Sequence, residues 1–147
     1  MEAIIFTGIQ AVGKSTFYKE RFFTSHIRIN LDMLRTRHRE AVLLRACIEA
    51  KQPFVIDNTN VTAAGRAVYI EAARSAGFRV CGYYFQSNLK DALERNRQRH
   101  GSEAIPEKGI LGTYSKLQIP MISEGFDQLF YVAIGEEDGF TVTEWSE

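Results

Sequence analysis

The fold of this chain is decided by the stretch Ala3-Ile4-Ile5-Phe6-Thr7-Gly8-Ile9-Gln10-Ala11-Val12-Gly13-Lys14-Ser15-Thr16. Its first five residues predict a short buried strand, and a helix is expected from Lys14 to Thr24. Between strand and helix, the residues from Gly8 to Ser15 match the pattern G-x-x-x-x-G-K-S/T. This pattern binds phosphate when it leads from a strand into a helix, which is the context predicted here.

The residue types of this loop match the chemistry of a nucleotide site. Glycines let backbone N–H groups approach phosphate oxygens, and the helix N-terminus adds the positive end of its dipole. The Lys14 ammonium can reach the β- and γ-phosphates, and the Ser15 hydroxyl can bind Mg²⁺. We therefore predict a nucleoside triphosphate site, with ATP and Mg²⁺ as cofactors. Its residues are Gly8, Ile9, Gln10, Ala11, Val12, Gly13, Lys14, Ser15 and Thr16.

Strands and helices alternate along the rest of the chain. Further strands are predicted over 26–30, 54–57, 78–85 and 129–134, with an added edge strand over 140–145. Helices are predicted over 32–51, over 63–76 between a Thr62 cap and Gly77, from a Ser87 cap to Arg99, and from the end of a loop over 100–112 to Gln118. Such alternation is typical of a doubly wound parallel sheet that binds ligands at the carboxyl ends of its strands. We predict an α/β fold in three layers, the P-loop NTPase fold of nucleotide kinases, in one domain over residues 1–147.

Composition fits a soluble globular domain, because 45% of the 147 residues are hydrophobic and 24% are charged. Disordered, collagen-like and disulfide-scaffold classes are thereby excluded. The apolar start is too short for a signal peptide, and no run approaches the roughly eighteen apolar residues of a membrane span. A cytoplasmic protein without a membrane partner is therefore expected. Cys47 and Cys81 lack C-x-x-C spacing and are expected to be buried, reduced thiols.

The net charge of zero conceals an asymmetry along the chain. Residues 1–100 carry 16 basic and 9 acidic side chains, a net charge of +7, whereas residues 101–147 carry 2 and 9, a net charge of −7. Arginine, which contacts phosphate in a bidentate manner, supplies 12 of the 18 basic residues. The basic part suits a phosphate-rich ligand, although a solvated helical surface gives the same count.

Among phosphate-loop proteins, two large classes are excluded. Mechanical ATPases usually carry Glu after the strand-end Asp, whereas Asn58 follows Asp57 in this chain. GTPases carry N-K-x-D and D-x-x-G motifs, and neither is present. The remaining class is a small phosphotransferase, which moves the γ-phosphoryl group to an acceptor hydroxyl and needs a base, an acceptor clamp and arginines for the transition-state charge.

Asp32 directly follows the second predicted strand, where the edge of an acceptor pocket is expected. In one continuous helix, Arg35 at i+3 and Arg39 at i+7 would share its face. The carboxylate could then accept the hydroxyl proton while Arg35 binds an acceptor phosphate. The alternative is that Asp32 only caps a helix and the arginines are solvated.

Two further groups are candidates for the site. Asp57 ends the third predicted strand, a frequent position for a carboxylate that supports Mg²⁺, although with Asn58 it could equally be turn chemistry. Arg95 and Arg99 are four residues apart and share one helix face, whereas Arg97 points away. With the loop that follows, they suggest a lid over the triphosphate at about 95–112. The alternative is a solvated basic helix end.

Together these motifs resemble the polynucleotide 5′-hydroxyl kinases of phage and of mammalian repair enzymes. The resemblance reaches from the loop to about Val132 and is carried by G-x-x-x-x-G-K-S-T, I-N-L-D-M-L-R, V-I-D-N-T-N, R-N-R-Q-R followed by I-P, and a closing segment with Tyr114, Pro120 and E-G-F-D. It implies that Asp32 is the general base, that Arg35 holds the acceptor phosphate and that Arg99 stabilises the transferring group. The sequence differs from the phage enzyme at Leu31, where that enzyme has an arginine that contacts the nucleic-acid strand. No D-x-D-x-T phosphatase motif is present.

The predicted site therefore comprises three groups of residues. The candidate catalytic residues are Lys14, Asp32, Arg95 and Arg99. The candidate acceptor-binding residues are Arg35, Arg39, Asp57 and Asn58. The candidate metal ligands are Ser15 and Asp57.

The leading hypothesis is an ATP-dependent kinase that phosphorylates a 5′-hydroxyl of a polynucleotide or nucleotide. Its partners would be a nucleoside triphosphate donor and a nucleic-acid or nucleotide acceptor. The alternatives are a small-molecule kinase of the same fold and a nucleotide-binding regulatory ATPase module. The presence of both Asp32 and Arg35 favours an acceptor over a mere switch.

Overall fold

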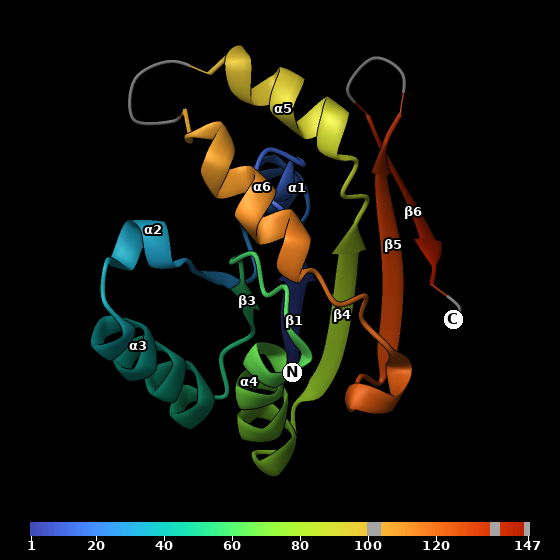
Figure 1. Cartoon of the computed structure of the whole chain (residues 1–147). Coiled ribbons are helices and arrows are strands. Elements are labelled where there is room, and N and C mark those ends of the chain that lie inside the picture. The colour runs from blue at the N-terminus through green and yellow to red at the C-terminus, as the bar shows by residue number, and fades with distance from the viewer. Residues whose placement is uncertain (100–103, 136–138, 146–147) are drawn as a thin grey trace.

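Strands and helices alternate along the chain in the predicted order (Figure 1). The computed structural model describes residues 1–99, 104–135 and 139–145. The strands are β1 (Glu2–Thr7), β2 (Ile27–Ile29), β3 (Phe54–Ile56), β4 (Arg79–Phe85), β5 (Gln128–Ile134) and β6 (Phe140–Glu144). The helices are α1 (Lys14–Arg21), α2 (Leu31–Leu34), α3 (Arg37–Ala50), α4 (Ala63–Ser75), α5 (Leu89–Arg97) and α6 (Glu107–Lys116), with a 3-10 turn η2 at Ile122–Glu124.

The six strands form one sheet in the order β2-β3-β1-β4-β5-β6. The first five strands run parallel, and Ile4 of β1 pairs with Val55 of β3 on one side and with Cys81 of β4 on the other. Strand β6 is antiparallel to β5 and forms the edge. The predicted mainly parallel sheet with an added edge strand is confirmed.

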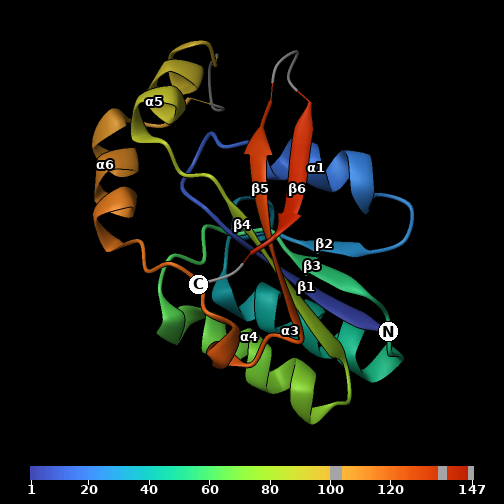
Figure 2. The same ribbon diagram turned by 90° about the vertical axis from the view of Figure 1, so that its right-hand side faces the viewer.

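Two layers of helices cover the sheet because side chains alternate along each strand (Figure 2). Ala3 and Ile5 of β1 point to one face, where they join a buried cluster with residues of α3 and α4. Ile4 and Phe6 point to the other face and join a cluster with residues of α1, α5 and α6. The predicted three-layer α/β fold is therefore confirmed. Both thiols are free and buried, as expected.

Aromatic packing fixes helix α1 against the centre of the sheet. The ring of Phe17 lies 5.8 Å from that of Phe6 on β1 and 5.3 Å from that of Phe85 on β4. All three rings are buried, and edge-to-face pairs of this kind contribute about 0.5–1.5 kcal/mol each beyond area burial. The loop between β1 and α1 therefore has two rigid ends.

The continuous helix predicted over 32–51 is wrong. Arg35 ends α2 with φ 75°, in the left-handed region, and Thr36 begins a new helix, α3. The Thr36 hydroxyl accepts the N–H of Arg39 at 3.1 Å, so it caps α3 instead of continuing α2. Arg39 consequently lies on a different helix from Asp32, and the face that the two residues were expected to share does not exist.

Other helix ends also differ from the prediction. Helix α1 ends at Arg21 instead of Thr24, and α6 begins at Glu107, inside the segment predicted as loop. Helix α5 is capped by Asn88, whose side chain accepts the N–H of Asp91, and not by Ser87. The cap predicted at Thr62 is confirmed, since its hydroxyl accepts the N–H of Gly65 at 3.1 Å.

A buried ion pair joins α4 to the turn η2. The Arg66 side chain is 0% exposed, and its Nε and Nη2 donate to the two carboxylate oxygens of Glu124 at 2.8 and 3.0 Å. Its Nη1 donates to the Asn60 carbonyl at 2.8 Å, in the loop after β3. Because the guanidinium has no access to water, its charge depends on this single carboxylate.

We expect Glu124→Ala to destabilise the protein by about 3–5 kcal/mol, because it leaves the buried Arg66 charge unpaired. Urea denaturation gives the free energy of unfolding. The matched control is Glu107→Ala, which removes a 3.0 Å pair between the exposed side chains of Arg97 and Glu107 and should cost less than about 1 kcal/mol. Equal losses in the two variants would contradict the assignment of Arg66 as a buried charge with one partner.

Candidate active site

The loop from Gly8 to Gly13 lies between β1 and α1, at the carboxyl end of the sheet. Gly13 has φ 90°, and a Cβ added there would lie 3.0 Å from the Phe140 ring of β6. Both its conformation and this close approach therefore require glycine. Ala11 has φ 62°, which costs a non-glycine residue about 1–2 kcal/mol. The side chains of Ile9 and Val12 are buried in the core and hold the loop from behind.

The Lys14 ammonium lies inside the loop. It donates hydrogen bonds to the carbonyls of Gly8 at 2.9 Å and Ile9 at 2.6 Å. Burial lowers the pKa of Lys14 from 10.5 to about 8. Asp57 and Asp32 act in the opposite direction and Arg99 in the same direction. Side chains from three distant parts of the chain thus act electrostatically on one ammonium.

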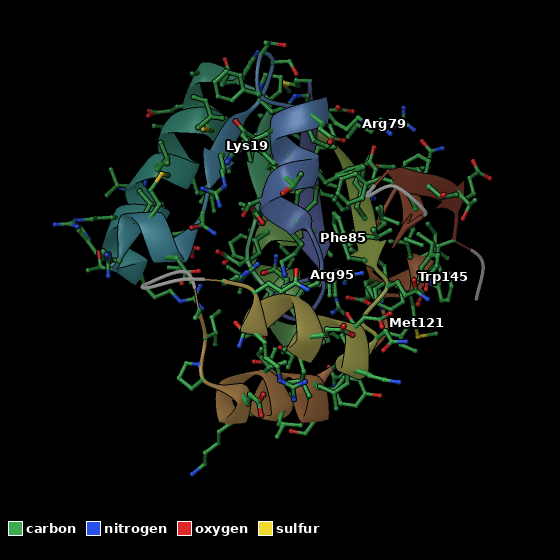
Figure 3. All side chains as sticks on the ribbon, turned by 90° about the horizontal axis from the view of Figure 1, so that it is seen from above. Lys19, Arg79, Phe85, Arg95, Met121 and Trp145 are labelled. Carbon is green, nitrogen blue, oxygen red and sulfur yellow. The ribbon has the colours of Figure 1, made fainter. Side chains whose placement is uncertain are left out.

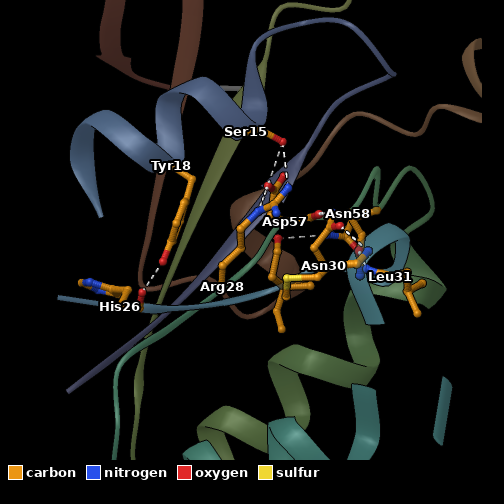
Figure 4. Close-up of polar contacts among 11 residues, drawn as sticks. Ser15, Tyr18, His26, Arg28, Asn30, Leu31, Asp57 and Asn58 are labelled. Carbon is orange, nitrogen blue, oxygen red and sulfur yellow. Dashed lines mark hydrogen bonds and ion pairs between the residues drawn. The ribbon is translucent and has the colours of Figure 1, made fainter. Parts of the chain in front are cut away.

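Ser15, Asp57 and Arg28 form a closed triangle of polar contacts (Figure 4). The Ser15 hydroxyl lies 3.3 Å from Asp57 Oδ2, to which it can donate. Arg28 donates from Nε to Asp57 Oδ2 at 2.8 Å and from Nη2 to Ser15 Oγ at 2.9 Å. The Asp57 side chain is 2% exposed, so the guanidinium supplies the counter-charge that this carboxylate needs.

A hydroxyl and a carboxylate side by side form a donor set that suits Mg²⁺. Magnesium prefers oxygen ligands and takes only one or two from the protein, with phosphates and waters as the others. Ser15 and Asp57 fit this role as predicted ligands. Across residues 1–99, 104–135 and 139–145, no three His, Cys, Asp or Glu side chains gather to hold a metal ion by themselves.

Two asparagines lock the strand ends next to this triangle. The Asn30 side chain donates to the Asp57 carbonyl and accepts the N–H of Met33 at 3.0 Å, which caps α2. Asn58 accepts the N–H of Leu31 at 2.9 Å. These bonds fix where α2 begins, and therefore where Asp32 lies in its first turn. The side-chain nitrogen of Asn58 also donates to Glu40 at 2.9 Å. The oxygen and the nitrogen of this side chain, which was predicted to bind the acceptor, therefore both have partners within the protein.

A cleft of about 320 Å³ brings several of the predicted residues together. Its lining includes Lys14, Ser15, Asp32, Asp57 and Arg99, together with further residues of the loop. Segments more than forty residues apart in sequence thus meet at one edge of the sheet, as predicted for carboxyl strand ends.

Six of the predicted residues do not line this cleft in the described part of the chain, namely Gly8, Ile9 and Val12 of the loop and the arginines Arg35, Arg39 and Arg95. Arg35 and Arg39 are exposed, and Arg39 donates to the Leu34 carbonyl at 3.2 Å across the turn between α2 and α3. Their positions follow from the helix break at Arg35, which the sequence analysis did not predict.

The arginines at the end of α5 lie in different surroundings. Helix α5 ends at Arg97 and not at the predicted Arg99, so Arg99 lies beyond the helix face that it was predicted to share with Arg95. Figure 3 shows Arg95 on the side of α5 that faces α1, and its Nη1 lies 3.5 Å from the Ala11 carbonyl. Arg99 lines the cleft, whereas Arg97 is exposed and pairs with Glu107 of α6. Part of the predicted lid, residues 100–103, lies outside the described residues.

The sequence did not predict the roles of Arg28 and Ser87 in the site, nor one contact of the predicted loop residue Gln10. Arg28 was expected only as a strand residue, although its polar side chain between Ile27 and Ile29 could have indicated a partner on the α1 face. Ser87 does not cap α5, and its hydroxyl instead accepts the N–H of Ile9 at 3.2 Å. Gln10 donates to Thr113 of α6 at 2.9 Å, which joins the loop to the helix that begins within the segment predicted as a lid.

A glycine loop between a buried strand and a helix, with a strand-end carboxylate beside it, defines the class of nucleotide-binding P-loop proteins. Residues 4–112 match the AAA domain family, and the chain belongs to this family of P-loop domains. It is also 30% identical over 132 residues to the bifunctional polynucleotide phosphatase/kinase of Schizosaccharomyces pombe. That match covers 85% of this chain but only 32% of the relative, so the chain spans about a third of the relative's length.

Solved structures with the same fold include P-loop kinases. Kti12 of Chaetomium thermophilum in complex with ADP-AlF3 superposes with a TM-score of 0.68 at 18% identity, over 92% of both chains. A gluconokinase of Sinorhizobium meliloti 1021 superposes with a TM-score of 0.66 at 16% identity, over 92% of this chain and 83% of that one. In the described part of the chain, no helix combines the length and the apolar character that crossing a bilayer requires.

The lowered pKa of Lys14 predicts how nucleotide binding depends on pH. Phosphate charges raise the pKa of Lys14 in the complex above its value of about 8 in the free protein, so binding takes up a proton above that pH. Affinity for ADP should stay level from about pH 7 to 8 and then fall by up to tenfold per pH unit. Fluorescence anisotropy of a labelled ADP in metal-free buffer measures this affinity at each pH. Lys14→Ala should bind ADP weakly, and its affinity should not begin to fall near pH 8. A level wild-type profile up to about pH 9.5 would contradict a lowered pKa.

Proposed function

We propose that this protein is an ATP-dependent phosphotransferase that moves the γ-phosphoryl group to a 5′-hydroxyl of a polynucleotide or nucleotide. The observation that carries the proposal is the shared cleft of Lys14, Ser15, Asp32 and Arg99. Binding of the ATP donor alone would need only the loop and the metal ligands. Asp32 adds a carboxylate that is not needed to bind ATP. The proposal treats residues 1–147 as one kinase domain with a lid at about 95–112, acting in the cytoplasm.

On the donor side, the loop N–H groups and Lys14 bind the triphosphate. Lys14 already faces the carbonyls of Gly8 and Ile9, from which it can turn toward phosphate oxygens. Ser15 and Asp57 would hold Mg²⁺ and its waters. When bound, the metal neutralises charge on the β- and γ-phosphates. Arg99 would stabilise the transferring group, and Arg95 would orient the loop through the Ala11 carbonyl.

On the acceptor side, Asp32 takes the proton of the attacking hydroxyl. Its side chain is exposed at the first turn of α2, and the Asn58–Leu31 hydrogen bond fixes that turn to the loop after β3. Asp32 lines one cleft together with residues of the phosphate loop. General-base catalysis needs such a carboxylate within hydrogen-bond reach of the acceptor. Arg35 and Arg39, which lie on the exposed side of α2 and α3, would contact acceptor phosphates farther from the reacting hydroxyl.

A second cavity of about 500 Å³ offers room for the body of an acceptor. It lies between α3 and α4 and shares Leu31, Asn58 and Thr59 with the nucleotide cleft. The similarity to the S. pombe polynucleotide phosphatase/kinase supports a polynucleotide acceptor. A small-molecule kinase is the second candidate, because this second cavity is large enough to hold a small acceptor.

Phosphotransfer from terminally labelled ATP to a panel of acceptors tests the proposal. We expect oligonucleotides or nucleotides with a free 5′-hydroxyl to be labelled, and the same molecules with a 5′-phosphate to remain unlabelled. Binding of a polynucleotide should also weaken steeply between about 50 and 200 mM salt. Labelling of sugars or other metabolites alone would favour the small-molecule kinase. Hydrolysis without any acceptor would favour a regulatory ATPase.

Asp32→Asn tests the catalytic base, because it preserves size and hydrogen bonding but cannot accept a proton. Turnover should fall by about 10²–10⁴-fold, the usual contribution of general-base catalysis, while ADP affinity hardly changes. Steady-state kinetics and ADP titration give the two quantities. Asp91→Asn is the matched control, since Asp91 is also an exposed aspartate in the first turn of a helix, α5. Rates within about twofold of wild type for Asp32→Asn, on an acceptor that wild type phosphorylates, would reduce Asp32 to a helix-end residue.

A further inference from the structure

Arg28 reaches the nucleotide site from the edge of the sheet. Its neighbour Ile29 packs in the cluster on the α3 and α4 face, so strand alternation points Arg28 to the opposite face, toward α1. There it meets Ser15 at the start of α1 and Asp57 at the end of β3 (Figure 4). The guanidinium therefore contacts the same two residues that suit Mg²⁺.

The Arg28 guanidinium takes one lone pair of the Ser15 hydroxyl and opposes a second cation beside it. The hydroxyl has one hydrogen and two lone pairs, and here it lies beside Asp57 while it accepts from Arg28. A metal ion at this oxygen needs a lone pair, and a dication beside a guanidinium is repelled by its charge. Arginine cannot relieve this conflict by losing its proton.

The burial of Asp57 explains why a cation is present without the metal. A carboxylate that is 2% exposed is costly unless its charge is compensated. The Arg28 side chain is 27% exposed, so its guanidinium can leave toward water at a lower cost than Asp57 could. Of the two partners, the arginine is the one that can move.

We propose that Arg28 and Mg²⁺ compete for the Ser15–Asp57 pair, and that Arg28 thereby sets how strongly the nucleotide complex binds metal. Arg28 is a positioning residue in this role, because it acts through the metal ligands and not on the reacting atoms. The inference rests on the proposed nucleotide and Mg²⁺ site. In the free protein, Arg28 holds Asp57 and Ser15 in place, and it gives up Ser15 when the metal binds.

Metal affinity of the ADP complex tests the competition. Mn²⁺ replaces Mg²⁺ at oxygen ligands, and electron paramagnetic resonance counts the free ion when protein is in excess over ADP. Arg28→Gln removes the charge but keeps hydrogen-bond donors, and it should bind Mn²⁺ about tenfold more tightly than wild type. Arg28→Lys keeps a positive charge and should stay closer to wild type.

Lys19→Gln is the matched control. Lys19 lies one turn after Ser15 on the same helix and is exposed, and in the described part of the chain its side chain has no hydrogen bond or ion pair with Ser15 or Asp57. Its loss of one positive charge should change the Mn²⁺ dissociation constant by less than about twofold, because solvent screens that charge.

Thermal unfolding provides a second readout. Arg28→Gln should lower the melting temperature of the metal-free protein, since Asp57 loses its counter-charge, and saturating Mn²⁺ with ADP should close most of that gap. A purely structural ion pair would instead lower it with and without ligand, and leave the Mn²⁺ dissociation constant unchanged. Equal dissociation constants for wild type and Arg28→Gln would overturn this inference alone. Absence of ADP binding by wild type would overturn the proposed function together with it.

Discussion

The nucleotide side of this structure depends on how the negative charge of one buried carboxylate, Asp57, is balanced. Asp57 closes β3 in an almost water-free position, where it meets a hydroxyl from α1 and a guanidinium from β2. The same charge raises the pKa of Lys14 against the effect of burial. Elements that share no sequence neighbourhood are thereby held to one geometry, because leaving any of these charges unpaired costs more than bringing them together.

The sheet makes this meeting possible. In parallel strands all carboxyl ends lie at one edge, so the loops after β1, β2 and β3 deliver their residues to the same place. Asn30 and Asn58 then convert approximate proximity into a fixed arrangement, because each bonds the backbone of the neighbouring loop. The position of Asp32 therefore depends on these two side chains as much as on β2, the strand that precedes it.

Local patterns predicted the parts of the fold that depend on local physics. The loop up to Ser15 and the short buried strand before it follow from residue types and spacing, and both are found as expected. The break at Arg35 was missed because Thr36 can either continue a helix or cap one, and the outcome depends on how α3 packs. Arg28 was missed for a related reason. An arginine between two isoleucines can indicate a polar partner, but that partner is identified only once β2 and α1 are placed side by side.

The close packing of Gly13 against Phe140 has a consequence for how the protein forms on the ribosome. The phosphate loop is synthesised before β6, yet one wall behind it comes from β6, some 127 residues later. During translation β1 and α1 can pack locally, but the loop lacks that wall until the hairpin of β5 and β6 emerges. The loop therefore reaches its final packing only after β6 has been made, although its own residues are made much earlier.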